Sequence, residues 1–293
     1  MPRIGSKVKG RREEMRTVEE IMVKVPIVVE VPGSRSDAIN VMVRNNVTGA
    51  PVVRSKDGQL VGIISRKDVF NNMDEEQLSL IMKKNIITVG PETTIEEVAR
   101  IFVEKRIHRL PVVEDGKLIG LVTPTDLLDD VKKLKTTMTA ENVITTTCVT
   151  TYEEDPLSYV VAAMRVSKIT SFPVLDAHGK LVGIITDRDM FLDQSKDVNA
   201  LKEMGLDEAN QQLAGYRNVL PLFYMAMNKD ISEDRKVKDY MIKEPTTVFK
   251  KTSLSEVAKL MKQYNFGQIP VRGNKDELLG MIYDVDVLSA LLR

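Results

Sequence analysis

The sequence is poor in the residues on which many metal and redox sites depend. Its 293 residues contain one cysteine, Cys148, and two histidines, His108 and His178. A single cysteine excludes a disulfide or a cysteine-based metal cluster within the chain. Two histidines are too few for a typical zinc site. We therefore expect no metal centre.

Long apolar runs and an excess of charge are also missing. The chain has 42 basic and 42 acidic residues, which gives no support for a nucleic-acid partner. No apolar run approaches the roughly 18–20 residues of a membrane span, and the N-terminal residues lack the apolar stretch typical of a signal peptide. We expect a cytoplasmic protein without a membrane segment. The basic residues 1–17 are expected to form a flexible, solvated terminus, with an arm for acidic lipid or RNA as the alternative.

An internal repeat dominates what is present. The stretch HRLPVVEDGKLIGLVTPTDLL begins at residue 108, and close relatives of it occupy residues 49–70 and 171–192. A weaker copy, GMIYDVDVL, begins at residue 280. Each copy ends on an aspartate, and these are Asp68, Asp126, Asp189 and Asp286. The first three lie about 60 residues apart, which is typical of a repeated structural unit.

The second copy shows the order of elements most clearly. Residues 87–89 are a short β-prone run, and residues 93–107 place apolar side chains at helical spacing. Two apolar runs follow, separated by EDGK, whose Asp-Gly favours a tight hairpin. Thr123 and Pro124 then have the pattern of a helix N-cap and first turn. This order predicts an α/β unit with helices packed on a small mixed sheet.

Four such units account for most of the chain. We place them at residues 18–73, 79–131, 136–193 and 236–292, and we expect them to form two pairs, 18–135 and 136–293. Residues 194–235 form an extra segment that we expect to be helical and to extend the third unit. Its apolar tract, residues 220–227, is expected to be buried against a neighbouring unit, with self-association as the alternative.

The repeated pattern resembles the CBS domain, a regulatory module named after cystathionine β-synthase. The resemblance implies a β-α-β-β-α fold in which two motifs pair face to face into a Bateman module. It also implies that adenine nucleotides or related ligands lie in the clefts between paired motifs. The arrangement of four motifs in one chain, with His108-Arg109 before Leu110-Pro111, is similar to the gamma subunit of AMP-activated protein kinase.

The repeated aspartates have two physical explanations. A Ser or Thr followed three residues later by an acidic residue is a capping box, which stabilises a helix start without any ligand. The alternative is that the short carboxylate accepts hydrogen bonds from a ribose diol while the first-turn N–H groups face a phosphate. The hydroxyls concerned are Ser65, Thr123 and Thr186, whereas Tyr283 replaces the hydroxyl in the fourth copy and is expected to block part of that cleft.

The remaining candidates contact the base and the phosphates. The resemblance implies that Thr88, Thr150 and Thr247 lie on the adenine side, with Val28 at that position in the first unit. His108 and Arg109 are the main phosphate candidates, because Arg offers a fork of donors and His becomes a cation beside a phosphate. Arg66, Lys67, Lys168 and Arg188 are expected to assist them from facing units. The alternative for His108-Arg109 is a solvated pair at a helix end.

We therefore expect a non-catalytic sensor that binds AMP, ADP or ATP and no catalytic cofactor. The alternatives are a sensor of S-adenosylmethionine and a ligand-free interaction scaffold. Enzyme activity is not expected, because four units leave no room for a catalytic barrel and Cys148 has no neighbouring histidine in the sequence. The chain is expected to form either a monomeric disc of four motifs or a homodimer, and to regulate a partner protein that the sequence does not identify.

Overall fold

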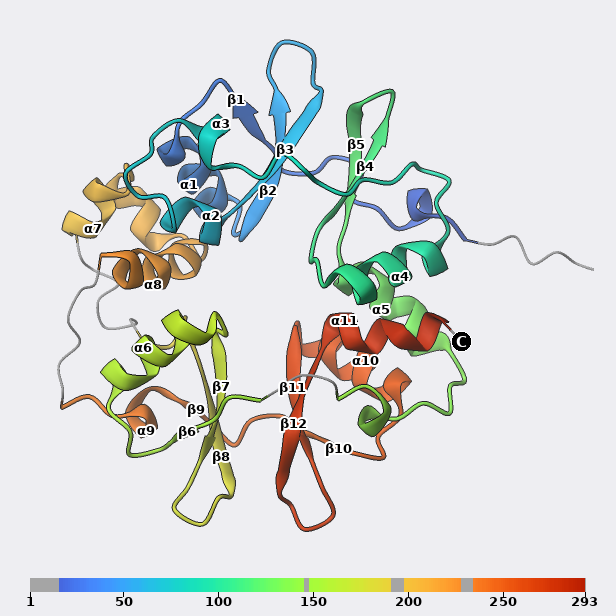
Figure 1. The fold of residues 1–293 in the computed structure, drawn as a ribbon, viewed down its shortest axis with the longest axis vertical. Coiled ribbons are helices and arrows are strands. Elements are labelled where there is room, and N and C mark those ends of the chain that lie inside the picture. The colour runs from blue at the N-terminus through green and yellow to red at the C-terminus, as the bar shows by residue number, and fades with distance from the viewer. Residues whose placement is uncertain (1–15, 145–147, 191–197, 228–233, 293) are drawn as a thin grey trace, which may run out of the picture.

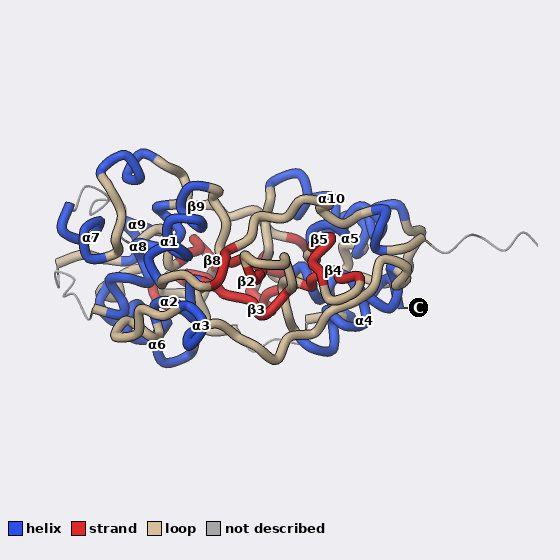
Figure 2. Tube along the Cα trace, turned by 90° about the horizontal axis from the view of Figure 1, so that it is seen from above, coloured by secondary structure: helices blue, strands red, loops and turns tan. Residues whose placement is uncertain are grey.

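The computed structural model describes residues 16–144, 148–190, 198–227 and 234–292. Most of the basic terminus therefore lies outside the described residues. Figure 1 shows four similar units around a common centre, with repeats one and two above repeats three and four. Viewed from above, strands gather in the middle and helices lie towards both ends (Figure 2). The fold is the expected mixed α/β arrangement of four motifs.

Repeats one and two contain the predicted helices and hairpins in the predicted order, but the first strand of repeat two is not formed. Apart from the short helix Leu78–Ile81, their α-helices begin at residues with capping side chains. For example, Thr94 Oγ1 accepts from Glu97 N at 3.2 Å, and Thr94 N donates to the Glu97 carboxylate at 3.1 Å. The elements are η1 (Val18–Glu20), β1 (Val29–Val31), α1 (Arg35–Arg44), β2 (Gly49–Arg54), β3 (Leu60–Ser65), α2 (Arg66–Phe70), α3 (Leu78–Ile81), α4 (Ile95–Lys105), β4 (Leu110–Glu114), β5 (Lys117–Val122) and α5 (Pro124–Lys133).

Repeats three and four follow the same order, with extra helices between them. Repeat three and the inserted segment contain η2 (Ala140–Asn142), β6 (Thr151–Tyr152), α6 (Leu157–Ser167), β7 (Ser171–Leu175), β8 (Leu181–Thr186), α7 (Val198–Glu203), η4 (Glu208–Gln212) and α8 (Tyr216–Ala226). Repeat four contains α9 (Val237–Tyr240), β9 (Ile242–Lys243), β10 (Val248–Phe249), α10 (Leu254–Tyr264), β11 (Gln268–Arg272), β12 (Leu278–Tyr283), α11 (Asp284–Val287) and η5 (Leu288–Leu292).

The hairpin is the most regular part of each repeat. In every copy the two strands pair antiparallel, and in each the register shifts at one position, such as Val112/Val113 in repeat two. The turn of repeat two has Asp115 at φ 50° and Gly116 at φ 77°, as a type I′ turn requires. The short strand expected at residues 87–89 is reduced to a single bridge between Val89 and Val112.

The segments that lead into the repeats cross over within each pair. Met22, ahead of repeat one, lies against Gly120 of repeat two, and Met82, ahead of repeat two, lies against Gly62 of repeat one. Met241 lies against Gly183 in the same way, and β9 pairs with β8. A glycine at this position leaves room for the crossing side chain. These contacts are reciprocal between repeats one and two, and the contact of Met241 with Gly183 joins repeat four to repeat three.

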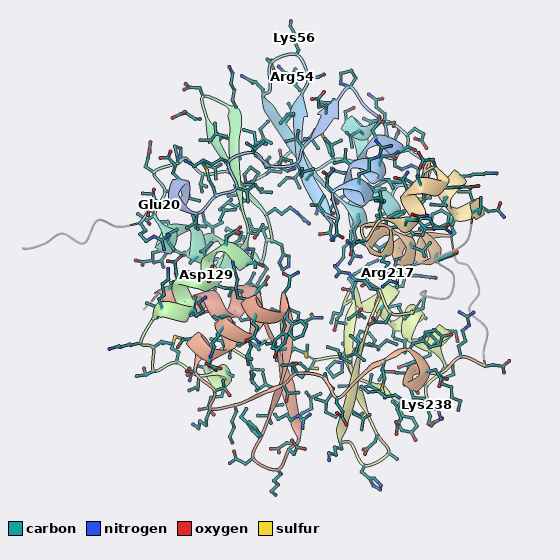
Figure 3. The ribbon with its side chains drawn as sticks, turned by 180° about the vertical axis from the view of Figure 1, so that it is seen from behind. Glu20, Arg54, Lys56, Asp129, Arg217 and Lys238 are labelled. Atoms are coloured by element: carbon teal, nitrogen blue, oxygen red, sulfur yellow. The ribbon has the colours of Figure 1, made fainter. Side chains whose placement is uncertain are left out.

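The two pairs meet through their helices. One apolar core joins repeats one and three with the inserted segment, and the other joins repeats two and four. On the second side α5 packs against α10, and Asp129 on α5 forms an ion pair with Lys262 at 3.1 Å (Figure 3). Helix-to-helix packing of this kind leaves the ends of the sheets near the centre of the molecule.

The inserted segment closes the first side. Helix α8 packs against α1 and α2 of repeat one, although it follows repeat three in the chain (Figure 1). Leu220, Phe223 and Tyr224 are buried in this contact, which confirms the burial expected for the apolar tract. Helix α8 approaches α1 so closely that a Cβ atom on Gly215 would lie 2.1 Å from the carbonyl oxygen of Val43. The insert therefore connects the two pairs and does not merely extend repeat three.

Candidate functional site

The repeated aspartates stand at the first turns that follow the hairpins. Asp126 Oδ2 accepts from Thr123 N at 2.8 Å and from Thr123 Oγ1 at 2.7 Å. Asp189 Oδ2 accepts from Thr186 N and Oγ1 at the same distances, and Asp68 Oδ2 accepts from Ser65 N at 2.9 Å and Oγ at 2.5 Å. The capping interaction is therefore formed in three repeats. It uses only one oxygen of each carboxylate.

The partners of the second carboxylate oxygen differ from repeat to repeat. Within the described ranges, Oδ1 of Asp126 and of Asp189 has no hydrogen-bond or ion-pair partner. Asp68 Oδ1 lies 3.4 Å from Nζ of Lys83, a side chain that is mostly exposed. A helix cap alone does not need this second oxygen, so it remains available to accept from a ligand hydroxyl.

Asp189 is the most perturbed of these carboxyls. Burial raises its pKa, the Thr186 hydroxyl and N–H lower it, and the nearby charge of Asp187 raises it again. The net direction is upward, so the ionised form is disfavoured in the protein without ligand. A partly buried carboxyl with a raised pKa is a candidate for ligand contact.

Cationic side chains from three repeats converge beside Asp68 and Asp189. Arg66 of repeat one is buried and forms an ion pair with Asp187 of repeat three at 2.9 Å. Its Nη1 donates to the carbonyl oxygen of Asn218 in α8 at 2.6 Å. Burial lowers the pKa of Arg66, Asp187 raises it, and the charge of Arg188 lowers it. Arg188 is therefore close enough to repel Arg66.

Arg109 of repeat two turns towards repeat one. It donates to Oγ1 of Thr48, and burial lowers its pKa, followed by the charge of Arg66, while Asp68 opposes both. Repeat one carries glycine, Gly49, where repeat two carries Arg109, and a Cβ atom there would lie 3.1 Å from Arg109 Nη1. A side chain at position 49 would therefore crowd the guanidinium of Arg109 in its present position.

Two lysines complete the group. Lys67 Nζ lies 3.4 Å from the carbonyl oxygen of Lys168, whose backbone has the left-handed conformation at the end of α6. Partial desolvation lowers the pKa of Lys67, and the charges of Arg66, Lys168 and Lys83 contribute. We call Arg66, Lys67, Arg109, Lys168 and Arg188 the cationic cluster. Five of the six predicted phosphate candidates thus lie within electrostatic range of one another.

His108, the sixth candidate, lies near repeat four and not beside the cationic cluster. Its Nδ1 lies 3.9 Å from Oδ1 of Asp284 in repeat four. Burial raises the pKa of Asp284, and the charge of His108 lowers it. Arg106, two residues earlier, forms an ion pair with Asp286. The segment 106–109 therefore contacts repeat one through Arg109 and repeat four through Arg106 and His108.

The candidates for the adenine side lie just before the first strands. Thr88 and Thr150 are exposed and Thr247 is partly buried. Each precedes a residue that pairs parallel with the hairpin: Val89 with Val112, Thr151 with Val174 and Val248 with Val271. The position is thus equivalent in the three repeats, and its side chains are accessible.

Four residues of the site were missed by sequence reasoning, and they are Arg106, Asp187, Asn218 and Asp284. Asp187 and Asp284 occupy the same place in their repeats, directly after Thr186 and Tyr283. Both are buried, and the same place holds Arg66 in repeat one. Opposite charges at equivalent positions of facing repeats are the signal that could have revealed the pairing of Arg66 with Asp187.

Comparison with known families agrees with this geometry. The model of the CBS domain matches residues 18–75, 78–133, 140–193 and 237–293. The chain belongs to the CBS domain family. Its four CBS motifs form two tandem pairs, and the matched segments exclude the helical insert. No helix of the described residues is long and apolar enough to cross a membrane, and the same residues hold no group of three His, Cys, Asp or Glu side chains that suits a metal ion.

Two solved structures share this four-motif arrangement. MJ1225 of Methanocaldococcus jannaschii, described as a candidate archaeal homolog of γ-AMPK, is 23% identical with a TM-score of 0.70, covering 94% of this chain and 99% of that one. An uncharacterized conserved protein of Pyrococcus horikoshii is also 23% identical, with a TM-score of 0.66 over 94% of this chain and 100% of its own. These similarities support the fold. In sequence, MJ1225 is 29% identical over 192 residues, which cover 59% of this chain and 68% of that protein.

Some relatives combine CBS motifs with an enzyme. Inosine-5'-monophosphate dehydrogenase of Thermoplasma acidophilum is 28% identical over 198 residues, which cover 62% of this chain but only 36% of the dehydrogenase. In this chain the four matched segments are all CBS motifs. The likeness to the dehydrogenase is thus to a minor part of that protein.

Proposed function

We propose that the protein is a non-catalytic sensor that binds phosphorylated adenosine ligands, AMP, ADP or ATP, in clefts of its CBS pairs. The observation that carries the proposal is the convergence of five cations from three repeats between Asp68 and Asp189. Asp187 offsets one of these charges through its ion pair with Arg66, whereas among the described residues the other four cations have no ion-pair partner, so repulsion between them remains. A polyphosphate would offset this repulsion.

The carboxylates would hold the sugar. In Asp126 and Asp189, Oδ2 is used by the cap while Oδ1 remains able to accept from a ribose hydroxyl. In repeat one Lys83 would have to move from Asp68, or bind the ligand itself. Thr88, Thr150 and Thr247 would face the base, and the hydroxyls of Ser65, Thr123 and Thr186 would keep each carboxylate in place.

The cationic cluster also suggests how binding is transmitted. Arg66, Lys67 and Arg109 belong to the first CBS pair, whereas Lys168 and Arg188 belong to the second. A phosphate that contacts both pairs would favour one relative arrangement of them. Differential affinity for two arrangements is what a regulatory ligand requires. A single chain already buries the helices of both pairs against each other, which supports a monomeric disc that acts on a separate protein.

S-adenosylmethionine is the rival ligand. It would use the same aspartates for its ribose, but it carries no phosphate for the cationic cluster. A ligand-free scaffold would need neither the accessible carboxylate oxygens nor the clustered cations. The cluster therefore favours a phosphorylated ligand over both alternatives.

Calorimetric titration of the stripped protein with adenosine, AMP, ATP and S-adenosylmethionine tests the proposal. We expect Arg109→Met to weaken ATP about 10–100-fold, as the loss of one charged hydrogen bond implies, and to leave adenosine unchanged. Arg100→Met is the matched control, because Arg100 lies on the exposed face of α4 and pairs only with Glu96 among the described residues. Binding of S-adenosylmethionine alone, or equal weakening by the control, would contradict the proposal.

A further inference from the structure

The fourth aspartate motif differs from the other three in its contacts. Asp286 Oδ2 accepts from Tyr283 N at 2.9 Å, as in the other caps, but Oδ1 forms an ion pair with Arg106 of repeat two. Its side chain is only 4% exposed. Both carboxylate oxygens therefore have partners, unlike those of Asp126 and Asp189.

Tyr283 takes up the space beside this carboxylate. It stands where the other repeats carry Ser or Thr, and burial raises the pKa of its phenol. Cys148, on the segment that leads into repeat three, is close enough to contribute to the same shift. The phenol is thus partly desolvated, close to both Asp286 and Cys148.

Arg106 lies at the C-terminal end of α4. It is the C-cap residue and has left-handed backbone, at φ 52°, as do Asn46, Lys168 and Asn265 at the equivalent positions. His108 faces Asp284 at 3.9 Å, so one turn of repeat two brings two basic side chains to two buried carboxyls of repeat four. Helices α4 and α11 adjoin at this contact (Figure 1).

We propose that Asp286 binds no ribose and instead forms, with Arg106, an ionic joint between the two CBS pairs. A buried carboxylate requires a cation or several donors, and Arg106 supplies the cation across the boundary. The proposal rests on the proposed function only in one respect, because it limits the ribose-binding aspartates to Asp68, Asp126 and Asp189.

A double-mutant cycle tests the joint through stability. Arg106→Gln leaves an unpaired buried carboxylate and is expected to lower the thermal midpoint by about 3–6 °C. Asp286→Asn keeps an oxygen for the Tyr283 N–H, so the double variant is expected to recover most of that loss. Arg100→Gln, on the exposed face of the same helix, is the control. Equal midpoints for Arg106→Gln and the control, or additive losses in the double variant, would overturn the joint.

Binding stoichiometry supplies the second test. Equilibrium dialysis with ATP is expected to give the same number of bound molecules for Asp286→Ala as for the wild type, and one fewer for Asp189→Ala. Loss of one bound ATP in Asp286→Ala would assign Asp286 to a ligand and overturn the proposal. If the wild type binds no ATP, the proposed function fails, and the stability cycle still decides whether the joint exists.

Discussion

The ionised form of the Asp189 carboxyl is disfavoured in the folded protein. Its pKa is raised by burial, although the Thr186 cap opposes the shift. Stability alone does not require a charged side chain here, because asparagine could also accept hydrogen bonds from Thr186 and would carry no charge. At the scale of single residues, Asp189 is therefore the position at which the proposed ligand-binding role and a capping role predict different effects of substitution.

The pH dependence of stability follows from this shift. A carboxyl whose folded pKa is raised favours the folded state at low pH, and this contribution is lost as the pH rises through the folded pKa. Asp189→Asn is therefore expected to raise the thermal midpoint at pH 7, with a gain that shrinks as the pH falls through the raised folded pKa and is lost by about pH 4, the ordinary value for aspartate. Scanning calorimetry across this range checks it. A difference between variant and wild type that is constant with pH would contradict the assignment.

At the scale of elements, each CBS pair is built by exchange of its leading segments. Met22 and Met82 cross to the glycine of the other repeat, and Lys83 pairs with Ile63 through backbone hydrogen bonds of 2.9 Å. The glycine is needed because the crossing chain passes directly over the strand. The two repeats of a pair are thus held together by packing of the crossing segment on the glycine-containing strand, and not only by the chain that links them.

Gly62→Ala tests the contact directly. The added Cβ atom would lie 2.7 Å from the carbonyl oxygen of Lys83, so the crossing segment must shift. We expect a loss of about 1–3 kcal/mol in the free energy of unfolding, measured in urea. Gly90→Ala is the matched control, since nothing lies within 4 Å of its added Cβ atom. Similar effects of the two substitutions would show that the close approach carries no stability.

The elements themselves could be predicted from the sequence. The helix that starts at Thr123-Pro124 and the hairpin at Asp115-Gly116 are set by neighbouring residues, and both were found as expected. The strand expected at residues 87–89 is not formed. Only Val89 pairs with the hairpin, through a single bridge to Val112. The direction of Arg109 towards repeat one could not be predicted, since it depends on the space left by Gly49 in another repeat.

At the scale of the whole molecule, the two CBS pairs meet differently on their two sides. On one side Arg66 and Asp187 are buried and covered by α8, whereas on the other Arg106, 43% exposed, holds Asp286. The repeat marks Arg66 and Asp187 as equivalent positions of opposite charge, but it does not show which repeats face each other, and Arg106 and Asp286 occupy positions that are not equivalent. The cationic cluster lies at the first side, where its ligand would contact both pairs.

The most direct test of the sensor function is calorimetric titration of ATP into the stripped wild type and into Asp189→Ala. We expect roughly micromolar binding in the wild type and a weakening of about 10–100-fold in the variant, because the variant loses a charged acceptor. Absence of binding in the wild type, or the same affinity in both proteins, would contradict the assignment of the cleft to a phosphorylated adenosine ligand.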